Sequence, residues 1–418
     1  MASQSVTTPT FFEKSQRIPP DRIFEITKLY QQNSSPNKVN LGQGAYRNEV
    51  GEPWVLPSVQ AARARLLSEG LNHEYLPIMG HAGFREEAAR LVLGDDLYNA
   101  QKSEGLSGTG SLRLAARLFA RSSGAPASGG PPKILIPRPA YANHGPVLSQ
   151  AGLECEFFDY FDSARSAVDV PSYKRALEAA APGTAVLLHA CAHNPTGCDP
   201  SREEWVALGE IIKERRLFPV FDAAYLGFNS GSVDEDAFAI RYFVRELGLE
   251  AAVCVSFAKN MGLYGERTGA VIVRASSAET AADCESMLEQ LQRQEVSNPP
   301  AFGAKIAHLV LSDGELRGQW YQDLVTMSDR IREMRRQLYE GLVKEKAPGQ
   351  WTHITSQSGM FGFLGLSPQI VTGLRESYHI FMADNSRISI AGLNERNIDY
   401  VAASIASCVR KEAEVSSK

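Results

Sequence analysis

The sequence predicts an α/β protein with a mainly parallel sheet sandwiched by helices, plus a smaller α+β domain. Short apolar runs recur through the middle of the chain without polar alternation, as in strands buried on both faces. Amphipathic helical patterns separate these runs, and such strand–helix alternation is typical of parallel sheets. The length of 418 residues suits two or three domains at about 150 residues each.

The strands and helices of the central region can be assigned in chain order. Five strands are predicted: Lys133–Pro137, Ala185–His189, Leu217–Asp222, Ala251–Ser256 and Ala270–Val273. Helical patterns cover Ser201–Arg216 and Asp236–Leu247. A Gly/Ser/Pro-rich patch at Ser122–Pro132 predicts a surface loop.

The C-terminal region has a different character, which predicts the second domain. A charged helical stretch runs over Gly314–Lys346, and no strand is expected until about His353. Strands are then predicted at Met360–Leu364 and Ile388–Ile390, with a last helix from about Asn397. We predict an N-terminal arm joining the small domain (1–51), a large domain (52–325) and a C-terminal small domain (326–418).

Composition excludes several classes of protein. The formal net charge is −5, which argues against a nucleic-acid-binding surface, and no polybasic run suggests a membrane surface. The six cysteines match no zinc spacing and are too sparse for a disulfide framework. No apolar stretch reaches the roughly 18 residues that span a bilayer, and Met1–Thr10 lacks a signal-peptide core. We therefore expect a cytoplasmic protein.

The segment Ser107–Ser111 (Ser-Gly-Thr-Gly-Ser) leads directly into a helical pattern, Leu112–Arg121. Backbone N–H groups and hydroxyls at such a helix start can bind an anion. The spacing is that of neither a Walker loop nor a dinucleotide-binding fingerprint. An anion site and an ordinary helix cap are both compatible with this segment.

Two further strands are followed by residues that could carry chemistry. Asp222 ends a buried strand, where α/β folds bind ligands, and would need a cationic partner there; Tyr225 follows closely. Lys259 lies just past the strand Ala251–Ser256, so partial burial should favour its neutral amine, the form that makes a Schiff base. Ser256 and Arg267 flank this lysine and could bind a phosphate. A capping aspartate and a solvated lysine are the structural alternatives.

The segment His189–Gly197 (His-Ala-Cys-Ala-His-Asn-Pro-Thr-Gly) follows another apolar strand. A metal site is not expected, because the His/Cys spacing is unlike known sites and no carboxylate lies nearby. Asn194–Pro195 is a turn signal with a candidate cis bond, and Asn194 could offer its amide to a ligand.

Four motifs together resemble the aspartate aminotransferase family, whose members have the fold-type I architecture of pyridoxal 5′-phosphate enzymes. The motifs are Asn72–Pro77 (NHEYLP), His189–Gly197, Ser256–Asn260 (SFAKN) with Glu266-Arg267, and Ser297–Pro300 (SNPP). They occur in the family's order, and the likeness runs from about Phe11 to about Arg410.

The resemblance implies a role for each residue around the cofactor, pyridoxal 5′-phosphate. Lys259 would form the Schiff base and shuttle the substrate proton, and Asp222 would pair with the pyridinium nitrogen. Tyr225 and Asn194 would bond the ring oxygen, and Tyr141 would stack on the ring. The phosphate would be held by six residues, the last one supplied by the other subunit of a homodimer: Ser107, Gly108, Thr109, Ser256, Arg267 and Tyr75.

The resemblance also implies a substrate site for an amino acid and a 2-oxo acid. Arg387 would take the α-carboxylate as a bidentate fork, with Gly44, Asn194 and Tyr141 beside it. Arg293 of the partner subunit would take the distal carboxylate of a dicarboxylic substrate. The implied reaction converts L-aspartate and 2-oxoglutarate to oxaloacetate and L-glutamate.

The sequence departs from the family around the expected substrate side chain. Tyr141 stands where the family usually has tryptophan, while His144 is retained as a partner for Asp222. Gln43, Phe24 and the pair Glu295-Val296 also replace the usual residues. A pyridoxal enzyme repurposed for another donor, or for β-decarboxylase, aldolase or replacement chemistry, is therefore an alternative. A non-catalytic phosphate- or nucleotide-binding protein is a third hypothesis, which would explain the Ser107–Ser111 loop alone.

Overall fold

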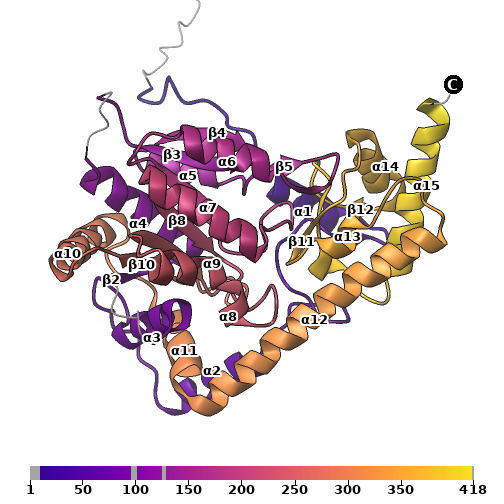
Figure 1. Ribbon diagram of the computed structural model, residues 1–418. Coiled ribbons are helices and arrows are strands. Elements are labelled where there is room, and N and C mark those ends of the chain that lie inside the picture. Colours follow the sequence, from indigo (N-terminus) through magenta and orange to yellow (C-terminus); the bar gives the residue numbers. More distant parts are fainter. Residues whose placement is uncertain (1–9, 96–100, 125–128, 417–418) are drawn as a thin grey trace, which may run out of the picture.

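A seven-stranded sheet forms the centre of the computed structural model, which describes residues 10–95, 101–124 and 129–416 (Figure 1). Its strand order is β2-β10-β9-β8-β7-β3-β4. The strands are β2 (Gln101–Leu106), β3 (Lys133–Arg138), β4 (Glu154–Asp159), β7 (Ala185–His189), β8 (Phe218–Ala223), β9 (Ala251–Ser256) and β10 (Thr268–Arg274). All five strands expected from the apolar runs are present, and β7 and β9 have the predicted bounds.

The sheet is mainly parallel, as predicted. Strands β4, β3, β7, β8 and β9 run in one direction, and β10 lies antiparallel to both β9 and β2. Every residue of β7 and β9 is buried, which agrees with their unbroken apolar sequences. The carboxyl ends of the five parallel strands therefore meet along one edge of the sheet.

Helices cover both faces of the sheet, and alternate strand residues pack into two separate apolar cores. Leu187, Val220 and Cys254 point to the face covered by α4 (Ser107–Ser122), α5 (His144–Gln150) and α10 (Ala278–Glu295). Leu188, Phe221 and Val253 point to the opposite face. The second face is covered by α3 (Ala82–Leu93), α6 (Val170–Ala179), α7 (Arg202–Arg215) and α11 (Ala301–Ser312).

The C-terminal part is built on α12 (Gly314–Lys344), which crosses the molecule from α2 (Pro57–Ser68) to α15 (Ile398–Ser416) (Figure 1). Its other elements are short: α13 (His353–Ser356), β11 (Phe361–Phe363), α14 (Pro368–Tyr378), β12 (Ile380–Phe381) and β13 (Arg387–Ser389). Strand β11 pairs antiparallel with β13. The strands predicted at Met360–Leu364 and Ile388–Ile390 are present as β11 and β13, with bounds that differ by one residue.

The N-terminal segment lies against this C-terminal part. Strand β1 (Val39–Asn40) pairs in parallel with β12, and α1 (Arg22–Gln32) packs on the same strand. We retain the division into 1–51, 52–325 and 326–418 as a proposal.

The expected helix over Asp236–Leu247 is wrong as a single element. The structure has α8 (Val233–Asp236), α9 (Phe238–Arg241) and a π-helical turn over Tyr242–Glu246. The Asp236 carboxylate accepts hydrogen bonds from the backbone N–H groups of Gly227, Asn229 and Ser230. The Asp236 side chain is therefore hydrogen-bonded to the preceding loop, and α8 ends at this residue.

Two contacts of α12 reach the loops that follow the sheet. The indole N–H of Trp320 donates to the carbonyl of Asn260 at 2.8 Å, one residue after Lys259. Arg335 is buried and donates to the carbonyls of Ile354, Ser358 and Gly359. Helix α12 thus supports both the Lys259 loop and the chain that leads into β11.

Within the described residues, no helix combines the length and the apolar character needed to cross a bilayer.

We expect Trp320→Phe to lower the free energy of unfolding by about 1–3 kcal/mol, because it shrinks a fully buried side chain and leaves the Asn260 carbonyl unpaired. Urea unfolding measures this change. Tyr321→Phe on the exposed side of the same helix is the control, with an expected change within about 0.5 kcal/mol. Equal losses for the two variants would contradict the role of the Trp320 hydrogen bond.

Candidate active site

The predicted anion loop begins α4 and faces the end of β9. Ser107, in a left-handed conformation at φ +59°, places its hydroxyl 2.6 Å from that of Ser256. A Cβ atom on Gly108 would lie 3.4 Å from Ser256 Cβ, so glycine leaves this approach open. Thr109 is half-buried in the first turn of α4. Two hydroxyls and the N–H groups of a helix start therefore converge, as an anion site requires.

Arg267 lies in the turn between β9 and β10 that returns to this loop. Its φ is +54°, and its side chain donates to the Tyr264 carbonyl at 3.0 Å while remaining exposed. The Thr268 that follows begins β10, and Gly269 pairs with Ser256 across the ladder. Arg267 thus lies directly before the strand that runs beside Ser256.

Asp222 is a buried carboxylate at the carboxyl edge of the sheet. His144, at the start of α5, is fully buried, and its Nε2 lies 2.8 Å from Asp222 Oδ2. Burial alone would raise the pKa of the Asp222 carboxyl, but the hydrogen bond to His144 and the electrostatic effect of the neighbouring basic side chains outweigh it. The pKa lies below its ordinary value, so Asp222 stays negatively charged.

Lys259 is a half-buried amine three residues beyond β9. Burial lowers the pKa of Lys259, the charge of Arg267 adds to that effect, and Asp222 opposes it. Its Nζ lies 5.4 Å from the centre of the Tyr225 ring. Burial also raises the pKa of Tyr225 above its ordinary value, so the phenol remains a neutral hydrogen-bond donor.

Arg387 opens β13 and is buried beside the turn after β7. Its Nη2 donates to the Gly42 carbonyl at 2.9 Å, and its Nη1 lies 3.4 Å from Asn194 Oδ1. Both acceptors are uncharged, and no described residue partners the buried Nε. Burial lowers the pKa of Arg387, which marks a cation without a full countercharge. The guanidinium can still accept a carboxylate.

The turn that carries Asn194 has the predicted conformation. The Asn194–Pro195 peptide is cis, and Asn194 is buried. Gly44 lies close to the ring of Phe361, since a Cβ atom there would be 2.8 Å from Phe361 Cζ. Asn194 therefore contacts Arg387 directly, and Gly44 lies against the Phe361 ring that packs on Arg387.

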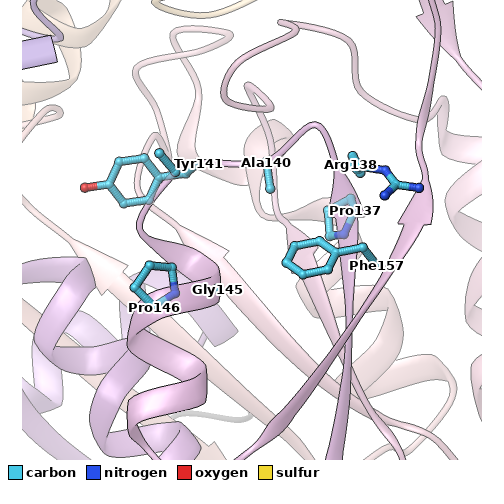
Figure 2. A pocket seen from close by; sticks show the side chains of 8 residues that line it. Pro137, Arg138, Ala140, Tyr141, Gly145, Pro146 and Phe157 are labelled. Carbon is cyan, nitrogen blue, oxygen red and sulfur yellow. The ribbon is translucent and has the colours of Figure 1, made fainter. Parts of the chain in front are cut away.

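Tyr141 lies at the edge of the site, with its ring packed edge-on against His144 at 5.3 Å. It lines a pocket of about 170 Å³ with Arg138, Pro146 and Phe157. Figure 2 shows its hydroxyl pointing away from Phe157. The side chain is 37% exposed. A ligand could therefore pack on this ring without displacing a buried core.

Two of the predicted site residues are not brought to this cluster. Tyr75 is 82% exposed, and Arg293 is exposed in the last turn of α10, where it donates to the Ser297 hydroxyl. Asn298 links the two regions, because its amide donates to the Leu76 carbonyl at 2.7 Å. Tyr75 and Arg293 thus belong to one surface of the chain.

The departures from the family occupy different environments. Gln43 is exposed and accepts a hydrogen bond from Arg47 at 3.3 Å, and Phe24 is 74% exposed on α1. Glu295 pairs with two arginines of α4, and Val296 is half-buried. Phe24 is thus exposed on α1, and Val296 lies directly after the end of α10.

Sequence reasoning missed two residues of the site. Phe361 packs its ring 4.2 Å from the Arg387 guanidinium carbon, which only the β11–β13 pairing reveals. The sequence suggested His189 only as a metal ligand, but its ring packs edge-on against His144 at 5.0 Å, and the residue lies opposite Asp222 in the ladder. The sequence did offer a signal for His189, because two neighbouring predicted strands both end in polar residues. No metal-binding group of three or more His, Cys, Asp or Glu side chains occurs in the described ranges.

The donor set fits pyridoxal 5′-phosphate. A buried amine could bind an aldehyde covalently, a buried carboxylate could face a protonated ring nitrogen, and a hydroxyl-lined helix start could hold a phosphate. Lys259, Asp222 and Ser107 with Ser256 supply these groups around one edge of the sheet. Arg387 adds a carboxylate site.

Comparisons with known proteins agree with this geometry. Residues 36–405 match the family model described as aminotransferase class I and II. The mitochondrial aspartate aminotransferase of Dictyostelium discoideum is 40% identical over 412 residues, covering 97% of this chain and 95% of the relative.

Solved structures give the same result. The cytoplasmic aspartate aminotransferase of Saccharomyces cerevisiae superposes with a TM-score of 0.92 at 39% identity, covering 96% of this chain and 99% of that one. An aromatic-amino-acid aminotransferase of Burkholderia pseudomallei, described as covalently bound to pyridoxal phosphate, has a TM-score of 0.91 at 36% identity. It covers 96% of this chain and 100% of that one.

We expect Asp222→Asn to lower the pKa of Lys259 further in the cofactor-free protein. The carboxylate is the group that favours the ammonium form, and its loss leaves burial and Arg267, which both disfavour it. Titration of ¹³C-methylated lysines by NMR measures the pKa, and Lys259→Arg assigns the signal. Asp234→Asn at an exposed carboxylate is the control. A pKa that stayed constant or rose in Asp222→Asn would contradict the electrostatic coupling.

Proposed function

The chain belongs to the class I and II aminotransferases, and within that family we propose that it transfers the amino group of L-aspartate to 2-oxoglutarate, giving oxaloacetate and L-glutamate. It is a pyridoxal phosphate-dependent transaminase with the fold-type I architecture. The observation that carries the proposal is a half-buried amine and a buried carboxylate at one sheet edge, with the Arg387 guanidinium close by.

We assign the cofactor-binding and catalytic roles as follows. Pyridoxal phosphate, when bound, supplies a carbonyl that accepts the amino group and a ring that withdraws electrons from the substrate α-carbon. Lys259 would hold it covalently, and its free amine would move the proton at the substrate α-carbon. Asp222, whose carboxylate is hydrogen-bonded to His144, would keep the ring nitrogen protonated. Tyr225 and Asn194 would donate to the ring oxygen.

The phosphate and the ring face are held by further residues. Tyr141 lies where it could stack on the ring, and the N–H groups at the start of α4 favour an anion. The proposed phosphate ligands are Ser107, Gly108, Thr109, Ser256, Arg267 and the partner subunit's Tyr75. Most of these groups are pre-positioned by the Ser107–Ser256 contact and the β9–β10 ladder, so little ordering accompanies binding.

Two arginines would select the substrate. Arg387, beside Asn194 and Gly44, binds the α-carboxylate common to all amino acids. The partner subunit's Arg293 binds the distal carboxylate, which only dicarboxylic substrates possess. The relatives include both aspartate and aromatic amino acid aminotransferases, so we infer that the distal contact decides between donors.

We propose that the working form is a homodimer with shared active sites. Tyr75 and Arg293 lie on the surface of their own chain, away from the Lys259 cluster. Large apolar side chains near the N-terminal end are also exposed, with Phe11 at 102%, Phe12 at 76% and Ile18 at 84%. A second copy that buries this arm would remove apolar area from water and would bring Tyr75 and Arg293 to the opposite site.

We also propose a cytoplasmic location. This proposal is supported by the likeness to the cytoplasmic aspartate aminotransferase of Saccharomyces cerevisiae, which is 39% identical. The named relatives include both a mitochondrial and a cytoplasmic enzyme.

A second function is favoured by one specific observation, the tyrosine at position 141. Tyr141 lacks the indole N–H donor that the family's tryptophan would offer near a distal carboxylate. The same site could then serve β-decarboxylase, aldolase or replacement chemistry. Turnover of L-aspartate without any 2-oxo acid would support this alternative, whereas a strict requirement for an acceptor would exclude it.

We expect L-aspartate and L-glutamate to be the preferred donors in a panel of amino acids, with the paired 2-oxo acid as acceptor and product formation as readout. Arg293→Lys should lower kcat/KM for aspartate at least about tenfold, because an ammonium cannot form the planar bidentate pair. The value for alanine should change little, since alanine has no distal carboxylate. Equal losses for both donors would mean that Arg293 does not bind the side-chain carboxylate.

We expect chains carrying Lys259→Ala and chains carrying Arg293→Ala to complement each other. Each variant alone lacks part of both sites, but a hybrid dimer has one complete site and should show about half the wild-type activity on aspartate. Refolding or co-expression of differently tagged chains, followed by two-step purification, isolates the hybrid. A hybrid as inactive as its parents would contradict the shared site.

A further inference from the structure

The last residue of α10 is a glutamate in an electrostatically unfavourable place. Glu295 lies at the negative end of the helix dipole, where a cation would be stabilised and an anion is not. Its side chain is only 23% exposed. The position therefore requires nearby cations, and its immediate neighbourhood supplies them.

Three arginines of α4 face the end of α10. Arg113, Arg117 and Arg121 are spaced by four residues and so share one side of α4. Arg113 Nε donates to Glu295 Oε2 at 2.8 Å, and Arg117 Nη1 lies 3.6 Å from Glu295 Oε1. Arg121 donates to the side chains of Gln290 and Gln294 at 3.2 and 3.4 Å. Glu295 thus supplies the negative charge in the contact between α4 and the end of α10.

The segment fixed in this way carries Arg293. Its guanidinium donates to the Ser297 hydroxyl, which in turn donates to Asn298 Oδ1 at 2.9 Å. Ser297 has a left-handed backbone at φ +68°, which closes a tight turn directly after α10. The Asn298 amide in turn donates to the carbonyl of Leu76, the residue after Tyr75. The end of α10, the turn and the Tyr75 segment are therefore one connected unit.

We propose that Glu295 is a positioning residue for dicarboxylic substrates: by pairing with Arg113 and Arg117 it fixes the end of α10, and with it the Arg293 guanidinium offered to the partner's site. The inference rests on the proposed function, because it gives Arg293 the role of binding the distal carboxylate. It adds a residue that touches neither substrate nor cofactor. The effect acts between chains, since Glu295 orients the arginine of its own chain for the site of the other.

The first test is a comparison of Glu295→Gln with the wild-type holoenzyme. Without the charge, the end of α10 is held less firmly, so KM for L-aspartate should rise roughly fivefold while kcat changes little. Kinetics with L-alanine should stay at the wild-type value. Calorimetric titration should show weaker binding of maleate, which has two carboxylates, and unchanged binding of propionate, which has one. Glu289→Gln, at an exposed glutamate of the same helix, is the matched control and should behave as the wild type.

The second test places the substitution in one chain of the Lys259→Ala/Arg293→Ala hybrid. The single complete site of that hybrid takes Arg293 from the Lys259→Ala chain. Glu295→Gln on that chain should raise KM for aspartate, and Glu295→Gln on the Arg293→Ala chain should not.

The outcomes separate the inference from the proposed function. An inactive parent hybrid, or an Arg293→Lys variant with no preference between donors, would overturn the proposed function. A normal Arg293 dependence combined with unchanged aspartate kinetics in Glu295→Gln would overturn only the inference. The same KM rise from either chain, or an equal loss for alanine, would reduce Glu295 to a general stabilising residue and would also overturn it.

Discussion

The carboxylate of Asp222 and the amine of Lys259 lie at the ends of neighbouring strands with little access to water, and much of the site is arranged around that constraint. Removing an ion from water costs several kcal/mol unless partners replace the solvent. Asp222 is hydrogen-bonded to His144, whose ring packs edge-on against His189, and the Asp222 charge opposes the pKa lowering of Lys259. A ligand that brings a cationic ring nitrogen and an aldehyde would satisfy both groups at once. The apolar strands that bury the two residues therefore also determine which ligand can bind.

Arg387 is another buried charged group whose partners within the chain are incomplete. Its neighbours Gly42 and Asn194 offer only neutral oxygens, so the buried guanidinium lacks a full countercharge in the chain itself. A substrate carboxylate would supply it. Tyr75 and Arg293, in contrast, are exposed on the surface of the chain. Under the proposed function, the inner half of the site lies within one chain, and a partner subunit would supply the outer half.

Strands β7 and β9 could be predicted from sequence to the residue, because an unbroken apolar run has no other stable place than the middle of a covered sheet. Strand β2 could not, since its Gln-Lys-Ser-Glu-Gly-Leu sequence is polar and becomes a strand only at the sheet edge beside β10. The places of Asp222 and Lys259 followed from the strands. The contact of Phe361 with Arg387 did not, because it depends on how β11 and β13 align. The π-helical turn after α9 likewise arises from tertiary packing.

Helix α12 is a long, continuous and therefore stiff element of the molecule. Its 31 residues extend over about 46 Å, and it is attached near one end to the Lys259 loop through Trp320 and further along to the chain entering β11 through Arg335. Trp320 is fully buried, so a tilt of α12 about this residue would move the far end of the helix much farther than Trp320 itself. A rotation of only a few degrees, transmitted through β11 to β13, would therefore open or tighten the mouth of the carboxylate pocket while the sheet stayed still.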